Sequence, residues 1–345
     1  MVQSRFEALG SYLPSTRIST QELISRMQFV PPFDLESITG IKERRVCSKN
    51  EDSFTMAIKA AKDALRRSRY QAKELELVIS CSVCRIKDQV NNYWEPSFAL
   101  FLAEQLGAIK AIHFDVSNAC AGMMTGVYIA DRMIKSGVVQ NALVVSGEYL
   151  TPVSETAVQE IDNPLDSQFA SLTVGDAGAA VILDRSENEQ DQIHEIELMT
   201  CAEYSNLCIG KPSDINGGPA LYTNNREMHK EERIRLWPTF QNDFLKQRNR
   251  TFELEQFDYI IHHQVSARAI ENFSKYAEPI FNAKMPESLS CVETLANTAT
   301  TSHFVVLHEY LKQNRLKKGS KILFVPAASG LVTGFVSATI SSLEA

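Results

Sequence analysis

Short runs of apolar and β-branched residues alternate along the chain with longer segments that have helical periodicity. Five of these runs have the length and composition of buried strands; they span residues 75–82, 142–146, 179–183, 259–262 and 322–326. The helical segments lie between them, at residues 53–68, 96–106, 122–136, 266–276 and 301–314. This alternation predicts an α/β fold, in which helices cover a parallel or mixed sheet.

The order of these elements recurs in the second half of the chain. The matching positions lie in a strand, at a helix start and in a later strand: Val78 and Tyr259, Cys120 and Asn297, Leu143 and Ile322. The pairs are separated by 181, 177 and 179 residues. We therefore predict a duplicated unit, with one half at residues 1–184 and the other at 185–345. Polar stretches and turn residues predict an irregular insertion at about residues 185–250.

Composition excludes several classes of protein. The chain has 345 residues, 44% of them hydrophobic and 22% charged, with a net charge of −7, which argues against nucleic acid or an anionic membrane as its partner. No apolar run approaches the roughly 18–20 residues that cross a bilayer, and the N-terminus lacks the apolar core of a secretory signal. Seven cysteines do not suggest a disulfide framework. We expect a cytoplasmic protein.

The most informative stretch surrounds Cys120, where an apolar run passes through small residues into an amphipathic helix. The N–H groups and dipole at a helix N-terminus favour an anion, and so we expect the pKa of this thiol to be lowered. Ala119, Ala121 and Gly122 leave room for backbone N–H groups to approach a developing oxyanion. The alternative is a buried cysteine with a structural role.

Two further junctions carry polar residues. His262 and His263 stand where a strand gives way to a helix, and only one of them can face a given site because strand neighbours point to opposite sides. Asn297 precedes an apolar helix, where it is either a cap or a site residue. The Cys and His spacing matches no metal template, and we expect no metal. Cysteine, histidine and asparagine at equivalent junctions are together more informative than any one of them.

With these residues in this order, the chain resembles the thiolase superfamily of condensing enzymes, and within it the β-ketoacyl-acyl-carrier-protein synthase III-like proteins. The resemblance extends over nearly the whole chain and rests on segments in a fixed order, at residues 38–45, 118–122, 175–180, 263–264, 297–298 and 328–334. It implies a thiolase-like fold of two duplicated halves in α-β-α-β-α layers. It also implies a homodimer whose substrates are acyl-CoA or acyl-carrier-protein thioesters, with no bound cofactor.

The resemblance assigns roles to single residues. Cys120 is similar to the nucleophile that takes an acyl group from a thioester. His263 is followed by Gln264, as in the family. His263 and Asn297 are similar to the pair that holds the second thioester's carbonyl oxygen and stabilises its enolate. The first oxyanion hole would use the backbone N–H groups of Cys120 and Ser329, although the family usually has glycine at the second position.

Two departures from the family carry information. In the family, an arginine and a tryptophan hold the adenine of coenzyme A, but here Ile38 takes the arginine position and no tryptophan lies near residues 33–36. An acetyl-CoA primer is therefore not implied. Glu95 stands before the proline of a loop that crosses the dimer interface, where the classical synthase has an aromatic residue. It is similar to the glutamate that acts as a base across the dimer in the head-to-head acyl-condensing branch; the alternative is a surface acid at a helix start.

Other residues are predicted more loosely. A basic set in an acidic chain is expected at the tunnel mouth, facing a carrier protein or coenzyme A phosphates, unless it forms a solvated helical face: Lys230, Arg233, Arg235, Lys246, Arg248 and Arg250. The tunnel lining is expected to include Phe98, Met123, Met124, Trp237 and Leu331. Cys81 and Cys84 lie on a predicted strand, and we interpret them as core residues rather than a redox pair.

The sequence thus predicts a ketosynthase that forms a carbon–carbon bond by Claisen condensation in fatty-acid or polyketide-type biosynthesis. A malonyl or β-ketoacyl thioester and an unactivated acyl thioester both remain possible as second substrate. In the unactivated case Glu95 would be the base, and head-to-head, cyclohexanedione or resorcinol products would follow. Acyl transfer to an alcohol or amine is a further alternative, although relatives that do this typically have Asp in place of Asn297. A non-catalytic subunit is disfavoured because Cys120, His263 and Asn297 are all present.

Overall fold

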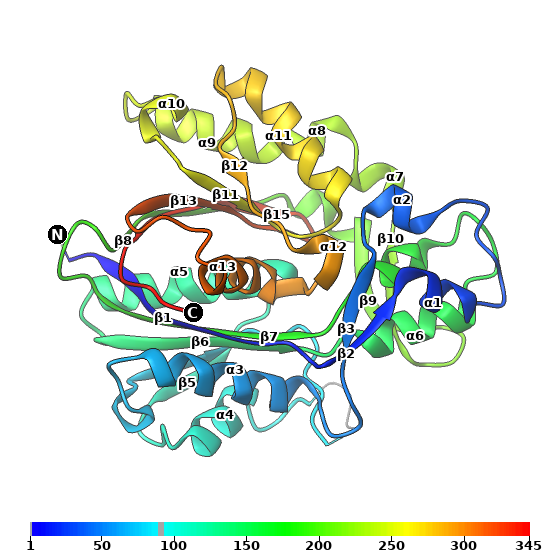
Figure 1. The fold of residues 1–345 in the computed structure, drawn as a ribbon, viewed down its shortest axis with the longest axis horizontal. Coiled ribbons are helices and arrows are strands. Elements are labelled where there is room, and N and C mark those ends of the chain that lie inside the picture. The colour runs from blue at the N-terminus through cyan, green and yellow to red at the C-terminus, as the bar shows by residue number, and fades with distance from the viewer. Residues whose placement is uncertain (1, 89–92) are drawn as a thin grey trace.

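The computed structural model describes residues 2–88 and 93–345. Two mixed sheets stack with helices between them and outside them, which gives five layers (Figure 1). The middle layer consists of α5 (Gly122–Lys135) and α13 (Ser302–Lys312), which contact both sheets. One outer layer holds α3 (Ser53–Arg67) and α4 (Phe98–Leu106), and the other holds α9 (Leu236–Lys246), α10 (Phe252–Glu255) and α11 (Ala267–Phe281).

The two sheets have the same topology. The first runs β1 (Ser4–Tyr12), β7 (Ala177–Arg185), β6 (Asn141–Glu148), β4 (Leu77–Ser80), β5 (Ile112–Asp115). The second runs β8 (Gln192–Thr200), β15 (Val332–Ile340), β13 (Ser320–Val325), β11 (Tyr259–His262), β12 (Glu287–Ser288), and the short β14 (Ala327–Ala328) also pairs with β15. In both sheets the fourth strand in this order pairs in parallel with both of its neighbours, and the remaining pairs are antiparallel. The internal duplication is therefore confirmed.

Registers in the two halves agree as well. Val78 lies opposite Leu143 in the first sheet, and Tyr259 lies opposite Ile322 in the second. The third pair of positions inferred from the sequence was wrong, because the equivalent turns are η2 (Ala119–Ala121) and η5 (Ala299–Thr301), each followed at once by a middle-layer helix. Both turns begin on an alanine with positive φ, 44° at Ala119 and 48° at Ala299. The structural counterpart of Cys120 is therefore Thr300, three residues after Asn297.

The remaining elements border the sheets. Two ribbons are formed by β2 (Thr16–Ser19) with β3 (Glu43–Val46) and by β9 (Cys208–Pro212) with β10 (Pro219–Thr223). The short helices are α1 (Thr20–Ser25), α2 (Leu35–Thr39), α6 (Thr151–Glu160), α7 (Asn225–Met228), α8 (Glu231–Ile234), α12 (Val292–Leu295), η1 (Ala72–Glu74), η3 (Ser167–Thr173) and η4 (Ala202–Leu207). Within residues 2–88 and 93–345, no helix is both long and apolar enough to span a bilayer.

All five predicted strands and all five predicted helices are present. The prediction of an irregular insertion at 185–250 was wrong for β8, which is an edge strand of the second sheet. Its buried Ile193 and Ile196 face the core, while Glu195 and Glu197 lie on a less buried side. The apolar spacing is three rather than two because the pairing with β15 shifts register between Ser337 and Ala338.

Helix α3 lies unusually close to the first sheet. Its small residues, Ala57, Ala60 and Ala64 among them, are fully buried. A Cβ placed on Gly147 of β6 would lie 1.9 Å from the backbone oxygen of Ser53, and one on Gly10 of β1 would lie 2.2 Å from the amide nitrogen of Ala64. Glycine is required at both positions because backbone contacts backbone there.

Replacing Gly147 with alanine should lower the free energy of unfolding by about 3 kcal/mol, since neither backbone can move away without disturbing the sheet. Urea unfolding of the variant measures this change. Gly210 is the matched control, because a Cβ there meets no atom within 4 Å. A Gly147→Ala variant as stable as Gly210→Ala would show that α3 moves freely on the sheet.

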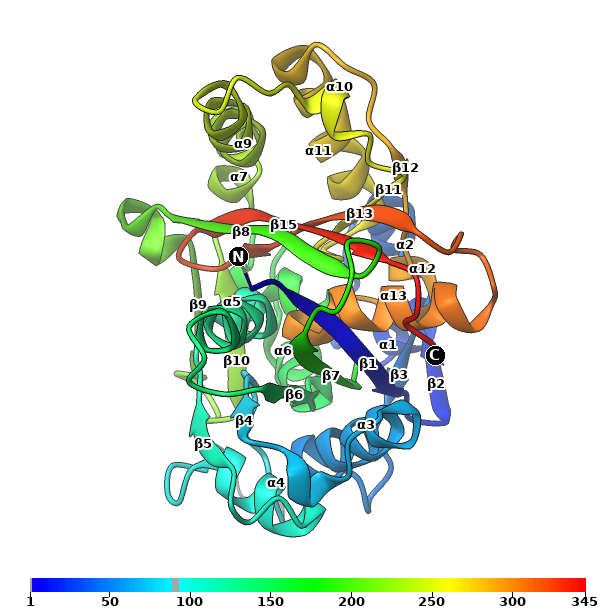
Figure 2. The same cartoon turned by 90° about the vertical axis from the view of Figure 1, so that its left-hand side faces the viewer.

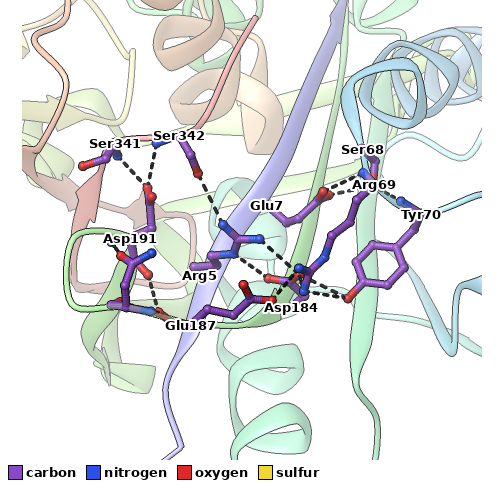
Figure 3. A network of polar contacts seen from close by, with 12 residues as sticks. Arg5, Glu7, Ser68, Arg69, Tyr70, Asp184, Glu187, Asp191, Ser341 and Ser342 are labelled. Carbon is purple, nitrogen blue, oxygen red and sulfur yellow. Dashed lines mark hydrogen bonds and ion pairs between the residues drawn. The ribbon is translucent and has the colours of Figure 1, made fainter.

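A polar network holds the connection between the two sheets (Figure 3). The buried carboxylate of Asp184, at the end of β7, accepts from Arg5 at 2.8 Å and lies 2.6 Å from Arg69. A few residues later, Asp191 accepts from the backbone N–H groups of Ser341 and Ser342 at 2.6 and 3.0 Å. The crossover from β7 to β8 is thereby fixed to β1, to the end of α3 and to the C-terminal segment, which fixes the relative position of the two halves.

Candidate active site

A cavity of about 160 Å³ lies where the two halves meet. Cys120 reaches it from the first half, and His263, Asn297 and Ser329 reach it from the second. The rest of its wall is mostly apolar and comes from η3, the β9–β10 ribbon, α7 to α9 and α11; it includes Leu221, Met228, Ile234, Leu236, Trp237, Phe273 and Leu331. The three polar residues predicted from separate junctions of the sequence therefore line one cavity.

Local backbone geometry places Cys120 at the cavity. The residue sits in η2, directly after the positive φ of Ala119, and α5 begins two residues later. A Cβ on Gly122 would lie 2.9 Å from the backbone oxygen of Cys81 and 3.1 Å from Thr300 Oγ1. The glycine thus allows the turn to pack between the end of β4 and the second half, with the thiol left partly exposed to the cavity.

The prediction that the helix N-terminus lowers the thiol pKa was wrong. Burial raises the pKa of Cys120 to about 12, with smaller contributions in the same direction from Cys208 and Glu148. One of the helix N–H groups that would stabilise a thiolate is already occupied, because Met123 N–H donates to Thr300 Oγ1 at 2.6 Å. Since desolvation of the charged form outweighs the remaining dipole, Cys120 is a neutral thiol in the resting protein.

His263 and His262 point to opposite sides of β11 and its continuation, as strand geometry requires. His263 lines the cavity, and its Nδ1 lies 2.9 Å from Ser302 Oγ. His262 is fully buried between the rings of Trp237 and Phe273, at centroid distances of 5.2 and 5.5 Å. Burial lowers the pKa of each imidazole to about 3, with a smaller contribution from His303, so both rings are neutral.

Asn297 is held by both its side chain and its backbone. Its Oδ1 accepts from Ala299 N–H at 2.9 Å, which turns the Nδ2 amide group away from that bond. Its backbone N–H donates to Thr173 O at 2.9 Å, and its carbonyl accepts from Gly175 N–H at 3.0 Å. A Cβ on Gly175 would lie 2.5 Å from the backbone oxygen of Leu295. The glycine-rich segment at 175–178 thus supports the asparagine from the first half.

Ser329 lies in the turn between β14 and β15 and lines the cavity together with Cys120. The turn closes through Gly330, whose φ of +82° is a left-handed conformation that favours glycine. The chain therefore brings a backbone segment of the second half to the side of Cys120, where the sequence predicted the second oxyanion donor.

Glu95 does not line the cavity of its own chain; it is exposed at the surface. The N-cap of α4 is Ser97, whose Oγ accepts from Leu100 N–H at 3.2 Å. Glu95 lies two residues before this cap as an exposed acid, so it is not itself the cap, and the alternative of a surface acid at the helix start stays open. Asp115, at the end of β5, accepts from Phe98 N–H and Ala99 N–H at 2.9 and 2.8 Å. The segment that carries Glu95 is thereby fixed beside the edge of the first sheet.

Among the predicted basic residues, Arg233 lines the cavity. Its side chain is only 10% exposed, lies 3.3 Å from Glu227 and stacks over the ring of Tyr204 at 4.5 Å. The others belong to local contacts: Lys230 pairs with Glu227, Arg235 with Glu231, Arg250 with Glu195 and Glu255, Arg248 stacks on Phe244, and Lys246 is exposed at the end of α9. These five do not line the cavity.

The predicted tunnel lining was correct for Trp237 and Leu331 and wrong for Phe98, Met123 and Met124. The last three are buried in the two cores that flank the first sheet, because their side chains point toward strands rather than toward the helix start. Cys81 is a core residue, as expected. The wall formed by residues 208–229 was missed because it carries no catalytic residue pattern. In the described part of the chain, no group of three His, Cys, Asp or Glu side chains is placed to hold a metal.

Known proteins are similar over nearly the whole chain. Family models described as 3-oxoacyl-[acyl-carrier-protein (ACP)] synthase III and its C-terminal part match residues 114–202 and 248–340. A β-ketoacyl-[acyl-carrier-protein] synthase III of Clostridium novyi (strain NT) is 31% identical over 342 residues, covering 97% of this chain and 98% of that protein.

Solved structures agree with this similarity. A cysteine-to-serine variant of Xanthomonas campestris OleA, with bound lauric acid and lauroyl-CoA, matches with a TM-score of 0.84 and 25% identity, covering 98% of this chain and 99% of OleA. The 3-oxoacyl-[acyl-carrier-protein] synthase III of Aquifex aeolicus VF5 matches with a TM-score of 0.78 and 26% identity, covering 97% and 99% of the two chains.

Proposed function

This chain belongs to the 3-oxoacyl-[acyl-carrier-protein] synthase III family of condensing enzymes, and we propose that within this family it joins two acyl thioesters head to head, with Glu95 of a partner subunit as base. The thiolase-like fold and the Cys-dependent Claisen condensation expected from the sequence agree with these relatives. The observation that carries the proposal is the position of Glu95, exposed beside a sheet edge and outside the cavity of its own chain.

In the first half-reaction, Cys120 Sγ attacks the carbonyl carbon of a donor thioester. A carbon–sulfur bond forms to the enzyme, the bond to the carrier thiol breaks, and the thiol proton passes to the departing carrier. The backbone N–H groups of Cys120 and Ser329 would hold the oxyanion between these two events. The apolar wall fits a long acyl chain, and lauroyl-CoA, which is bound to the OleA variant, carries such a chain.

In the second half-reaction, an α-carbon of the second thioester attacks the acyl group on Cys120. Removal of an α-proton makes an enolate, whose oxygen Asn297 Nδ2 and His263 would hold. The new carbon–carbon bond forms, the bond to Cys120 Sγ breaks, and a β-ketoacyl thioester is released. The proton taken from the α-carbon returns to the Cys120 thiolate, so that base and thiol regain their starting states. Arg233, buried at the cavity wall, would contact a phosphate of the coenzyme A or carrier-protein arm.

A homodimer would supply the base. Strand β5 is the edge of the first sheet, and its Ile112 is 49% exposed. Trp94 and Ile109 are 80% and 77% exposed in the flanking segments. The exposed backbone of an edge strand favours pairing with another chain. Pairing of two copies here would bring the Glu95 segment of each against the other subunit.

Replacing Glu95 with glutamine should abolish condensation of two acyl-CoA molecules, with a loss of about 10²-fold or more, because no base remains to remove the α-proton. Acylation of Cys120 should continue at the wild-type rate. Mass spectrometry of the products and of the intact protein measures the two steps separately. Glu104→Gln, at an exposed position on α4, is the matched control.

A decarboxylative route is the second candidate, because the curated relative is a β-ketoacyl synthase III. In that route a malonyl thioester loses carbon dioxide to give the enolate, and Glu95 is not needed. Full condensation by Glu95→Gln with malonyl thioesters, and no product from two acyl-CoA molecules in the wild type, would replace the head-to-head proposal with this one.

A further inference from the structure

Lys87 lies among three aromatic rings, close to the segment that carries Glu95. Its Nζ is 5.4 Å from the ring centre of Phe54, 5.8 Å from that of Tyr93 and 5.1 Å from that of Phe101. The lysine side chain is only 19% exposed. An ammonium group is attracted to aromatic faces within about 6 Å, so the three rings hold the cation in one place.

The rings come from three different parts of the chain. Phe54 stands at the start of α3, Phe101 lies on α4, and Tyr93 comes two residues before Glu95. Figure 2 shows α3 and α4 side by side at the outer face of the first sheet. Phe101 contacts both other rings edge to face, at centroid distances of 6.2 Å to Phe54 and 5.5 Å to Tyr93. The cluster therefore ties the Glu95 segment to two helices that are packed on the sheet.

The lysine is itself fixed and charged. Its Nζ donates to the carboxylate of Asp88, and this hydrogen bond raises the pKa of Lys87. The backbone N–H of Asp88 donates at 3.0 Å to Asp52 Oδ2, and Asp52 is the N-cap of α3. Lys87 thus carries its positive charge at neutral pH and is held at the start of the same helix that supplies Phe54.

Glu95 is held between two anchors. Downstream, Asp115 accepts from the first two backbone N–H groups of α4 at 2.9 and 2.8 Å. Upstream, Tyr93 N–H donates to Arg85 O at 2.9 Å, and the Tyr93 ring contacts Lys87. The downstream anchor is made by the backbone alone, whereas the upstream one depends on the charge of a side chain.

We propose that Lys87 is a positioning residue, which through Tyr93 holds Glu95 in the orientation that reaches the second substrate in the partner subunit. The inference rests on the proposed function, because it concerns the base of the second half-reaction. A base acts only within hydrogen-bond reach of the proton, about 3 Å, and a displacement of about 1 Å costs up to 10²-fold in rate. Acylation of Cys120 does not use this base, so the two half-reactions should respond differently to the loss of Lys87.

Lys87→Met keeps a long side chain against the rings and removes its charge. It should slow the condensation of two acyl-CoA molecules about tenfold, while acylation of Cys120 continues at the wild-type rate. Lys87→Arg should condense at close to the wild-type rate, because a guanidinium also binds aromatic faces. Phe101→Leu, which removes one ring, should slow condensation as Lys87→Met does. Product analysis and intact-protein mass measure the two steps separately.

Lys59→Met is the matched control. Lys59 lies on α3, and its Nζ is 4.1 Å from the ring centre of Tyr12, so this variant loses a lysine–tyrosine contact of the same kind. Its partners Tyr12 and Glu51 lie outside the Glu95 segment. Both half-reactions of Lys59→Met should therefore proceed as in the wild type.

Trp94, next to Glu95, reports on the segment directly. The chain has two tryptophans, and Trp94 is 80% exposed. In a Trp237→Phe background, the decay of Trp94 fluorescence anisotropy measures its rotation on the nanosecond timescale. Lys87→Met should increase the amplitude of the fast decay, and Lys59→Met should leave it unchanged. This readout does not depend on whether the protein condenses acyl groups.

Equal condensation rates for Lys87→Met and Lys59→Met would overturn the proposal, and so would an unchanged Trp94 decay in Lys87→Met. An equal loss of acylation and condensation would overturn it as well, because the lysine would then support the fold in general. If Lys87→Met does not fold, Phe101→Leu decides by the same criteria. If Glu95→Gln condenses at the full rate while Lys87→Met frees Trp94, the proposed function is wrong and the role of Lys87 in fixing the segment stands.

Discussion

Intact protein incubated with long-chain acyl-CoA should gain the mass of one acyl group, and the Cys120→Ala variant should gain none. We expect the rate of acyl uptake to fall by roughly 10³-fold or more, because the variant has no group at the start of α5 that can form the covalent bond. The pKa of the Cys120 thiol is raised to about 12, so general alkylating reagents should label it slowly in the absence of substrate, in contrast to a cysteine of low pKa.

Cys208 is the informative control for this experiment. It lines the same cavity from the β9–β10 ribbon, and its Sγ lies 3.3 Å from Thr223 Oγ1. Cys208→Ser should acylate like the wild type, since Cys208 lies on an edge ribbon and not at a helix start. Acyl uptake that survives in Cys120→Ala and disappears in Cys208→Ser would move the nucleophile to the ribbon and contradict the assignment made here.

Acidification from pH 6.5 to pH 5 should lower the free energy of unfolding by several kcal/mol, because three fully buried imidazoles stay neutral in the folded protein. Burial lowers the pKa of His262 and His263 to about 3 and that of His303 to about 4. The unfolded chain binds protons at these residues near pH 6.5, and the folded chain does not. Stability is therefore present above pH 6.5 and is lost as the pH falls, by roughly 2 kcal/mol for each residue at pH 5.

Two buried carboxyl groups act in the opposite direction. Burial raises the pKa of Glu148 to about 7 and also raises that of Asp176. The folded protein takes up a proton at Glu148 as the pH falls, which offsets roughly 2 kcal/mol of the loss. The three histidines together lower the free energy of unfolding by more than Glu148 raises it. The net effect of acidification is therefore destabilising, by roughly 4 kcal/mol.

His262 separates the histidine contribution from general acid effects. Its two ring nitrogens have no hydrogen-bond partner in the described residues, and two aromatic rings flank it. His262→Phe should reduce the stability lost between pH 6.5 and pH 5 by roughly 2 kcal/mol. Urea unfolding at both pH values and one protein concentration measures this difference. His229→Gln, at an exposed histidine, should leave the pH dependence unchanged, and an unchanged pH dependence in His262→Phe would contradict the explanation.

The sequence predicted the residues that stand at strand-to-helix junctions, because both the order of elements and the residue types are local information. Cys120, His263 and Asn297 each follow or precede a regular element with clear periodicity, and they line one cavity. The pKa of Cys120 was predicted with the wrong sign because the residues that bury it are distant in the sequence and the Thr300 contact comes from the other half of the chain. Such contacts leave no pattern near residue 120.

The parts of the fold that were missed have the same cause. Strand β8 carries charged residues on one side and follows a polar loop, so its sequence does not stand out from a surface segment. The sequence around Arg250 indicates an unpaired cation, but in the structure Arg250 pairs with Glu195, which lies 55 positions away in the sequence. Only the pairing of β8 with β15 shows that Glu195 belongs to the second sheet.

The equivalence of η2 and η5 also bears on how many acyl groups one chain can hold. The duplicated architecture offers two matching turns, each with an alanine of positive φ ahead of a middle-layer helix. A thiol stands at one of them, and a threonine hydroxyl at the other is already bonded to the first helix. The second turn thus supports the first, and we expect a protein built from two equivalent halves to be loaded with one acyl group per chain and not two.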